Sequence, residues 1–289
     1  MQSVCFFASY FTGNSLPYYI TVYLKELNKH FTKVVLLSSQ SNLQDSDLQF
    51  LKAENIQLMI EKNEGFDFGL WYKAFQQFDI SSFEQVALVN DSCILFKPLN
   101  EFMNWSCTNK ADLQGMTLSD SIAPHVQSYF LILQRSAIKH AVIYFKEHKI
   151  LANISDVIKT YEVGLSTYLI SKGLKIDSYM DNNGYSGEYS PYYHCIDYHI
   201  AKGIPLIKKK ILFESYRKDE LFTLARMNFN ISVAYYINLI KMNSKNLIID
   251  FNKLDADKSE ILPWLAKIKY QLSVAGINTV RHFRKRKYC

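Results

Sequence analysis

Residues 85–99 read Q-V-A-L-V-N-D-S-C-I-L-F-K-P-L, and this stretch decides how we interpret the fold. Its first apolar run, residues 86–89, has the length and composition of a strand that is buried on both faces. Asn90, Asp91 and Ser92 then interrupt the run, and buried polar side chains need hydrogen-bonding partners. In open α/β sheets, ligands bind at the carboxyl ends of the strands. The alternative is an Asx-turn, in which Asn90 or Asp91 only satisfies nearby backbone groups.

The segments before this stretch alternate between strand and helix patterns. In chain order they are a strand at residues 4–10, a helix at about 17–30 that Ser15 can cap, a strand at 33–38, a helix at 46–54, a strand at 56–60 and a helix at 70–78. This alternation predicts an α/β fold with a mostly parallel sheet, right-handed crossovers and flanking helices. Ligand-binding loops should then gather at the strand ends. The candidates there are Ser9, Tyr10, Ser38 and residues 61–67, which include Asn63.

Asp67 lies in the motif E-K-N-E-G-F-D-F-G, at the expected start of a helix. A carboxylate in this position is favoured by the helix dipole, so a capping role is one interpretation. The functional alternative is a carboxylate that hydrogen-bonds the ribose or base of a nucleotide.

The rest of the chain continues the α/β pattern and then becomes helical. After a short strand, residues 112–121 hold a polar loop, followed by a strand at 125–133, helices at 137–149 and 156–172 and a strand at 174–179. Amphipathic helical patterns occupy residues 221–241 and 263–287. We therefore expect an α/β domain at residues 1–220 and a helical C-terminal extension with a basic tail at residues 221–289.

The composition excludes several classes of protein. The chain has 289 residues, is 48% hydrophobic and carries a net charge of +6 concentrated at its end, which does not by itself indicate nucleic-acid binding. Its five cysteines are widely spaced, so neither a disulfide framework nor a structural zinc site is expected. The first residues lack the basic start of a signal peptide, and no apolar run approaches the roughly 18 residues that span a bilayer. These features favour a cytoplasmic protein, at most peripheral on a membrane.

Several catalytic and binding motifs are missing, and what remains fits a sugar nucleotide. There is no G-x-G-x-x-G, G-x-x-x-x-G-K-[ST], G-x-S-x-G or H-E-x-x-H. His194 and His199 are five residues apart and are expected to be surface or hydrogen-bonding residues rather than zinc ligands. Polar groups at several strand ends are joined by Glu162 on a helix and by the lysines at 208–210. A diphosphate needs a divalent cation, lysines or a helix N-terminus, and glycosyl transfer needs a base.

Five short motifs carry a resemblance to a known family. In chain order they are N-E-G-F-D-F-G-L-W, V-N-D-S-C, H-V-Q-S-Y-F-L, Y-E-V-G-L-S and G-I-P-L-I-K. Together they resemble the rhamnan synthesis protein F family of bacterial polysaccharide glycosyltransferases across about residues 4–213. The stretch V-N-D-S-C-I-L-F-K-P-L also resembles the strand and DxD segment of GT-A glycosyltransferases, in which two acidic residues hold a metal ion on the diphosphate.

The resemblance implies a role for each candidate residue. Asn90 and Ser92 fall where the two acids of a DxD motif stand, and neutral oxygens are weaker ligands for a hard cation than carboxylates. Either Asp91 alone holds Mg²⁺ or Mn²⁺, or the site is metal-independent and uses cationic side chains. The other implied roles are Glu162 as the base of an inverting enzyme, Asp67 at the nucleoside, Gln127 and Ser128 at a sugar and Lys208 at the diphosphate.

The resemblance further implies an inverting, GT-A-like transferase that moves a sugar from a nucleotide-sugar donor to a growing cell-surface polysaccharide such as an O-antigen, capsule or rhamnan. The family name implies L-rhamnose from dTDP-L-rhamnose, with UDP- and GDP-sugars as other donors and lipid-linked or polymeric glycans as acceptors. The basic end R-H-F-R-K-R-K-Y-C suits an anionic membrane surface, and a solvated tail is the alternative. The rivals are a retaining transferase on the same fold and a non-catalytic glycan-binding or scaffold subunit.

Overall fold

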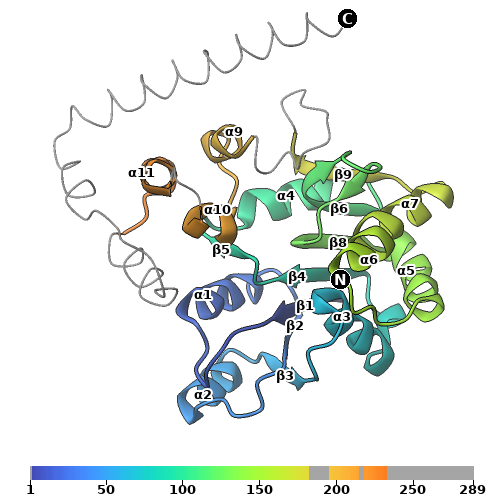
Figure 1. Cartoon of the computed structure of the whole chain (residues 1–289), viewed down its shortest axis with the longest axis horizontal. Coiled ribbons are helices and arrows are strands. Elements are labelled where there is room, and N and C mark those ends of the chain that lie inside the picture. Colours follow the sequence, from blue (N-terminus) through green and yellow to red (C-terminus); the bar gives the residue numbers. More distant parts are fainter. Residues whose placement is uncertain (1, 182–194, 215–217, 233–289) are drawn as a thin grey trace, which may run out of the picture.

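The computed structural model describes residues 2–181, 195–214 and 218–232. Within them, eight strands form one mixed sheet in the order β3-β2-β1-β4-β8-β6-β7, with β9 paired to β6 (Figure 1). The pairs β1–β2, β1–β4, β2–β3 and β6–β9 are parallel, and β4–β8, β6–β8 and β6–β7 are antiparallel. This confirms the predicted α/β fold class with a mostly parallel sheet and flanking helices.

The first half of the chain follows the predicted strand–helix alternation. Its elements are β1 (Ser3–Ser9), α1 (Tyr18–Leu27), β2 (Lys33–Ser38), α2 (Asp45–Ala53), β3 (Gln57–Ile60), α3 (Phe66–Gln77), η1 (Ile80–Ser82), β4 (Gln85–Asn90) and β5 (Cys93–Leu95). The expectation for Ser15 is wrong, because Pro17 is the N-cap of α1 and no side chain caps this helix end. Pro17 instead precedes the first turn, where its fixed φ angle suits a helix start.

The second half departs from the predicted elements at several points. Its elements up to residue 180 are α4 (Asn100–Thr108), β6 (Leu113–Ser119), β7 (His125–Val126), β8 (Phe130–Gln134), α5 (Arg135–Glu147), α6 (Ile154–Val157), the π-helix η2 (Ile158–Val163), α7 (Gly164–Ser171) and β9 (Ile176–Met180). The expected polar loop belongs largely to β6, which continues to Ser119. The expected strand at 125–133 is split into β7 and β8 by a turn at residues 127–129, whose polar side chains find partners there.

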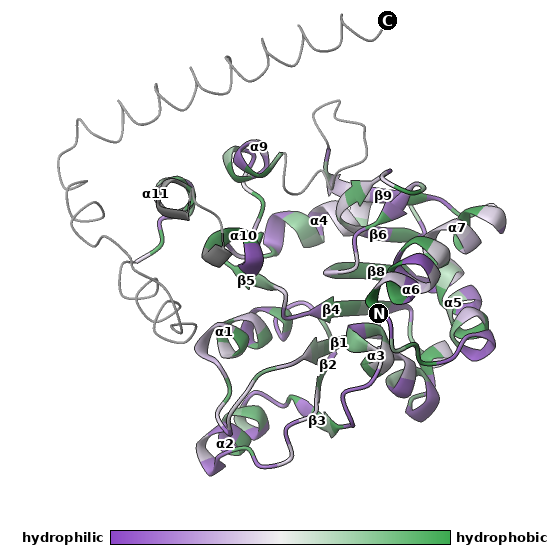
Figure 2. Cartoon of the chain, in the orientation of Figure 1, coloured by the Kyte–Doolittle hydropathy of each residue, from purple (hydrophilic) through white to green (hydrophobic). Residues whose placement is uncertain are grey.

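Two hydrophobic cores cover the two faces of the sheet (Figures 1 and 2). Side chains alternate between the faces of a strand, so the neighbours Phe6 and Phe7 in β1 enter different cores. Residues of α1, α2 and α4 pack with Phe7 on one face, and residues of α3, α5 and α7 pack with Phe6 on the other. The same alternation continues along β4 and decides where its polar end points.

The described part of the chain after residue 194 packs onto the α1 face. It contains α9 (Ile196–Ala201), β10 (Leu206–Lys208), α10 (Lys209–Glu214) and α11 (Lys218–Phe229). The α11 helix spans the predicted domain boundary at residue 220 and buries Leu221 and Ala225 in the core of that face. The rest of the predicted extension and the basic tail lie outside the described residues, so the domain division stays a prediction. Among the residues described, no helix is both long enough and apolar enough to cross a bilayer.

Candidate functional site

The carboxyl end of β4 sends two neighbouring side chains in opposite directions. Val86 and Leu88 lie in the core on the α3 face, and Ala87 and Val89 lie in the core on the α1 face. Asn90 therefore continues toward the α3 face, where its Nδ2 donates to Oδ2 of Asp67 at 2.7 Å. The next side chain turns toward α1.

Asp91 is the acceptor at the centre of a buried polar cluster. Its Oδ2 accepts hydrogen bonds from Ser9 Oγ at 3.2 Å, Tyr19 Oη at 3.2 Å and Lys209 Nζ at 3.3 Å. The Lys209 ammonium also donates to Tyr19 Oη at 2.8 Å and lies over the Tyr19 ring, 4.7 Å from its centroid. The Asp91 side chain is 9% exposed and that of Lys209 is 24% exposed, so Lys209 is the more accessible partner.

The β10 strand places the lysine run opposite the polar turn that follows β4. It pairs antiparallel with β5, so that Lys208 faces Cys93, and the backbone N–H of Lys209 donates to the Ser92 carbonyl at 2.8 Å. Lys208 lies over the Tyr129 ring, 5.3 Å from its centroid, while Lys209 turns to Asp91, and Lys210 is exposed. The predicted diphosphate ligand Lys208 thus lies beside a second lysine that the sequence reading did not single out.

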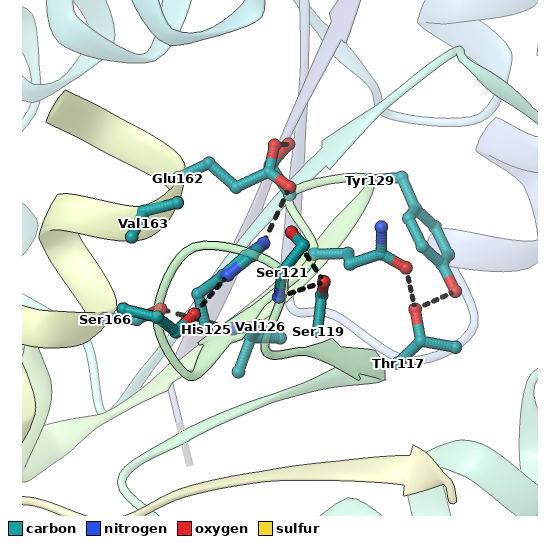
Figure 3. Close-up of polar contacts among 12 residues, drawn as sticks. Thr117, Ser119, Ser121, His125, Val126, Tyr129, Glu162, Val163 and Ser166 are labelled. Atoms are coloured by element: carbon teal, nitrogen blue, oxygen red, sulfur yellow. Dashed lines mark hydrogen bonds and ion pairs between the residues drawn. The ribbon is translucent and has the colours of Figure 1, made fainter. Parts of the chain in front are cut away.

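Glu162 lies in the π-helix η2, between α6 and α7 (Figure 3). Its Oε2 accepts from Ser128 Oγ at 2.7 Å, and its Oε1 lies 3.5 Å from Nε2 of His125. The other ring nitrogen of His125 donates to the Ala123 carbonyl at 2.7 Å, so Nδ1 carries a proton. Short π-helical segments are frequent at functional sites because the wider turn redirects side chains. Here the π-helical turn contains Glu162, the residue predicted to be the base.

A hydrogen-bonded turn holds the residues that face Glu162 (Figure 3). Gln127 Oε1 accepts from Thr117 Oγ1 at 2.7 Å, and the Thr117 hydroxyl lies 2.9 Å from Tyr129 Oη. The Ser166 hydroxyl of α7 accepts from the Val126 backbone N–H at 3.2 Å. These contacts fix the turn between β7 and β8 against both β6 and α7.

Aromatic packing joins the Asp67 and Glu162 ends of the site. The rings of Phe68 and Tyr161, which follow Asp67 and precede Glu162 in the chain, stack with centroids 5.2 Å apart. Asp67 and Glu162 are near enough for their charges to interact, since the negative charge of Glu162 raises the pKa of Asp67. The charges of both Asp91 and Glu162 thus act on Asp67.

Burial and charge shift the pKa values of Asp67 and Glu162 in opposite directions. Burial is the main cause that raises the pKa of Asp67 to about 7, with Asp91 adding to the rise and Lys209 and Asn90 opposing it. Burial would also raise the pKa of Glu162, but hydrogen bonds from His125 and Ser128, helped by Lys208, lower it overall. Burial disfavours the imidazolium of His125, yet Glu162 and the Ala123 carbonyl raise its pKa. The pair therefore favours an ionised Glu162 and a protonated His125.

The residues around Asp91 do not fit a chelated Mg²⁺ or Mn²⁺. Asn90 Oδ1 accepts from both the backbone N–H of Ser92 at 3.1 Å and its hydroxyl at 2.6 Å, so the two DxD positions bind each other. Asp91 lies on the opposite face and has the ammonium of Lys209 on its Oδ2. Within the described residues, no group of three or more His, Cys, Asp or Glu is arranged to hold a metal ion. No step proposed below passes through a metal.

The remaining predicted residues lie at strand ends but differ in access. Tyr10 is 56% exposed after β1, and Asn63 is exposed in the loop before α3. Ser38 is fully buried, and its Oγ accepts from the Gln40 backbone N–H at 3.1 Å. His199 is buried in α9 and makes a hydrogen bond to the Asp181 carbonyl, and His194 lies outside the described residues.

Sequence reasoning missed three participants: Tyr19, His125 and Lys209. His125 opens the quoted motif H-V-Q-S-Y-F-L, and its place at the start of an apolar strand was a usable signal. Lys209 stands in a run of three lysines, and only the register of β10 against β5 distinguishes it from its neighbours. Tyr19 lies in a helix that reads as an ordinary amphipathic one.

Comparison with solved structures finds distant likenesses. A cytidylyltransferase from Leptospira borgpetersenii serovar Hardjo-bovis matches with a TM-score of 0.42 and 12% identity, over 86% of this chain and 99% of that one. The glycosyltransferase GlyE of Streptococcus pneumoniae TIGR4 gives 0.42 and 12%, over 84% and 63%. Residues 1–349 of S. aureus TarS give 0.39 and 14%, over 84% and 79%. At these TM-scores the likenesses support no inference about function.

Comparison with families is decisive, while comparison with curated proteins finds no match. The model of the family described as rhamnan synthesis protein F matches residues 34–269. The match reaches well beyond residue 213, so the expectation that the resemblance ends near there is wrong. The chain belongs to the rhamnan synthesis protein F family.

Proposed function

We propose that this protein is a glycosyltransferase that moves a sugar from a nucleotide-sugar donor to a growing cell-surface polysaccharide. The observation that carries the proposal is that the polar end of β4 holds both Asp67 (through Asn90) and the Asp91–Lys209 pair, while the charge of Glu162 acts on Asp67. Membership of the rhamnan synthesis protein F family supports the substrate class. The family name supports L-rhamnose as the sugar, carried by dTDP, with UDP and GDP as the other candidates.

Glu162 acts as the general base in this proposal. The acceptor hydroxyl attacks the anomeric carbon, its proton passes to the Glu162 carboxylate, and the bond from that carbon to the diphosphate oxygen breaks. Attack opposite the departing diphosphate inverts the anomeric configuration. The lowered pKa of Glu162 keeps the carboxylate ionised and able to accept a proton at neutral pH, at a cost in basicity, because a general base works best when its pKa lies near the working pH.

The other site residues bind the donor. Asp67 binds the nucleoside, and Asn90 and Ser92 hold it in place through a chain of hydrogen bonds. Lys208 approaches the diphosphate. Gln127 and Ser128 face a sugar, since they lie in the turn that contacts Glu162. The exposed strand-end residues Tyr10 and Asn63 complete the proposed nucleotide-binding set, while buried Ser9 supports it through its hydrogen bond to Asp91 and buried Ser38 through the backbone of Gln40.

The proposed acceptor is a lipid-linked or polymeric glycan at the cytoplasmic face of a membrane. The basic end of the chain, R-H-F-R-K-R-K-Y-C, supports peripheral association with anionic lipid. A nucleotide-sugar donor supports the cytoplasm as the place of reaction.

A nucleotide panel tests the proposed function. Thermal unfolding is measured with UDP, GDP and dTDP, and the sugar nucleotides of the diphosphate that stabilises the protein are then assayed for transfer. We expect one diphosphate to raise the melting temperature, because a ligand that binds only the folded state stabilises it. A protein that responds to none of the three is not a nucleotide-sugar transferase.

A non-catalytic glycan-binding or scaffold subunit is the second candidate function. Asn90 and Ser92 at the two DxD positions favour it, since neither is an acid. Such a subunit would bind glycan fragments while ignoring all three diphosphates. A retaining transferase is a third reading, distinguished by the anomeric configuration of the product.

A further inference from the structure

We propose that Lys209, held in place by Asp91 and Tyr19, takes a phosphate of the donor and supplies the positive charge that a DxD metal ion would supply. The inference rests on the proposed function and adds a residue and a mode of diphosphate recognition to it. It identifies an anion site at the carboxyl ends of β1 and β4, where the chain combines one buried carboxylate with a lysine.

The first observation is that Lys209 is oriented rather than solvated. Its ammonium has two acceptors, Tyr19 Oη at 2.8 Å and Asp91 Oδ2 at 3.3 Å. An ammonium has three N–H donors, so one remains for a ligand. The Lys209 side chain is 24% exposed, which leaves that donor accessible.

The second observation is that the Asp91 cluster already holds an ammonium where a DxD metal ion would bind. Asp91 Oδ2 already accepts hydrogen bonds from Ser9, Tyr19 and Lys209. A divalent cation bound there would be repelled by the Lys209 ammonium. A phosphate oxygen has the opposite charge and approaches the ammonium favourably. Asp91 then serves as the positioning residue that aims Lys209 rather than as a ligand of the donor.

The third observation is the backbone that fixes the lysine. The β10–β5 pairing and the hydrogen bond from the Lys209 N–H to the Ser92 carbonyl fix the start of α10 beside the turn after β4. Lys208 emerges on the Tyr129 side of the same strand, where its charge lowers the pKa of Glu162. One lysine therefore acts near the base while the other faces the end of β1.

In the transfer step, Lys209 offsets the charge that forms on the leaving group. The electron pair of the breaking bond moves to the diphosphate oxygen, which gains negative charge as the nucleoside diphosphate departs. A fixed ammonium beside that oxygen stabilises the transition state without reorganisation. Lys209 keeps its proton throughout, so the proton balance stays with the acceptor and Glu162.

The experiment compares Lys209→Met with Lys210→Met, a matched control at the exposed neighbouring lysine. Dissociation constants are measured by calorimetry for UDP, GDP and dTDP and for uridine, guanosine and thymidine. For the preferred base, we expect Lys209→Met to weaken diphosphate binding by about 10- to 100-fold, the loss typical of one charge-assisted hydrogen bond. Nucleoside binding should be unchanged, and Lys210→Met should behave as the unsubstituted protein.

Metal dependence gives a second measurement on the unsubstituted chain. Diphosphate binding should be equal in EDTA and in Mg²⁺ or Mn²⁺. Binding that EDTA abolishes and Mg²⁺ restores overturns the inference, as does equal diphosphate affinity in the Lys209→Met and Lys210→Met variants. An unsubstituted protein that binds none of the three diphosphates overturns the proposed function itself.

Lys209→Met leaves Asp91 buried without its cation, so a double variant guards against misfolding. Asp91→Asn combined with Lys209→Met removes both charges together, which is far less costly than removing one partner of a buried pair. We expect the double variant to fold and to show the same loss of diphosphate affinity. Full diphosphate affinity in the folded double variant contradicts the inference.

Discussion

The Nε2 atom of His125 lies 3.5 Å from Oε1 of Glu162, although 37 positions separate the two residues in the chain. His125 lies on β7 and Glu162 on the π-helix η2, and the turn that joins β7 to β8 brings Ser128 onto the same carboxylate. This pair makes the proposed base an anion with a defined orientation. It also makes the pH dependence of the protein predictable.

Glu162→Gln should lower the rate of transfer by about 10²- to 10⁴-fold, because the amide cannot accept the acceptor's proton. Binding of the nucleoside diphosphate should change little, since the substitution preserves shape and the hydrogen bond from Ser128. Steady-state kinetics and calorimetry on the same preparation check both halves. A loss of only a few-fold in rate would argue against a general base and favour the retaining mechanism.

His125→Gln should move the acidic limb of the pH profile of kcat/KM to higher pH. The imidazolium is one of the groups that lower the pKa of Glu162, so its loss lets that pKa rise. Ser119→Ala is the matched control, because the Ser119 hydroxyl donates to Ser121 in the neighbouring loop. An unchanged acidic limb in the His125→Gln variant would show that His125 does not lower the pKa of the catalytic base.

His125→Gln should also destabilise the protein, and most strongly in mildly acidic solution. Because the pKa of His125 is raised in the folded state, its stabilising effect is full below the unfolded pKa of about 6.5 and is lost as the pH rises through the folded value. Above about pH 4.5 Glu162 remains ionised. The deficit in free energy of unfolding should therefore be larger at pH 5.5 than at pH 8.5, as urea titrations at the two pH values would reveal.

Asp67→Asn should stabilise the protein in mildly alkaline solution. The pKa of Asp67 is raised to about 7 in the folded state, against about 3.9 for an unfolded chain, so ionising it costs stability as the pH rises through this interval. Asparagine removes that cost and can still accept from Asn90 Nδ2. We expect a melting temperature higher by about 2 °C or more at pH 8 and little gain at pH 4. Equal melting temperatures of the Asp67→Asn variant and the unsubstituted protein at pH 8 would show that ionising Asp67 does not destabilise the folded state. The substitution should also weaken nucleotide binding if Asp67 contacts the nucleoside.

Gly164→Ala should destabilise the protein, although alanine is the better helix former by about 1 kcal/mol. A Cβ at this position would lie 2.5 Å from Tyr144 Oη and 3.0 Å from the Lys159 carbonyl, so the tyrosine must move. Overpacking of this kind costs about 1–3 kcal/mol, measurable as a lower urea midpoint. Ser171→Ala, at the end of the same helix, is the control. A stabilised Gly164→Ala variant would show that Tyr144 in α5 and the backbone of η2 move aside at little cost in free energy.

Much of the first half of the fold could be read from the sequence because its signals are local. Strand and helix patterns up to residue 90 depend on hydrophobic periodicity, and the structure places β2 at Lys33–Ser38 as predicted. The split of residues 125–133 into β7 and β8 could not be read, since it depends on the partners that Gln127 and Tyr129 find in β6. The π-helix at Glu162 also has no local signature.

The sequence by itself determined the alternation of strands and helices, and with it the gathering of polar residues at the carboxyl ends of β1, β2 and β4. It also carried the family, through five short motifs in order. Only the tertiary structure decided that Asn90 turns to Asp67 while Asp91 turns to Lys209, which lies 118 positions further along the chain. The physical reason is that periodicity reports which face of a strand a residue occupies, whereas the partner on that face depends on strand register and helix packing between distant segments.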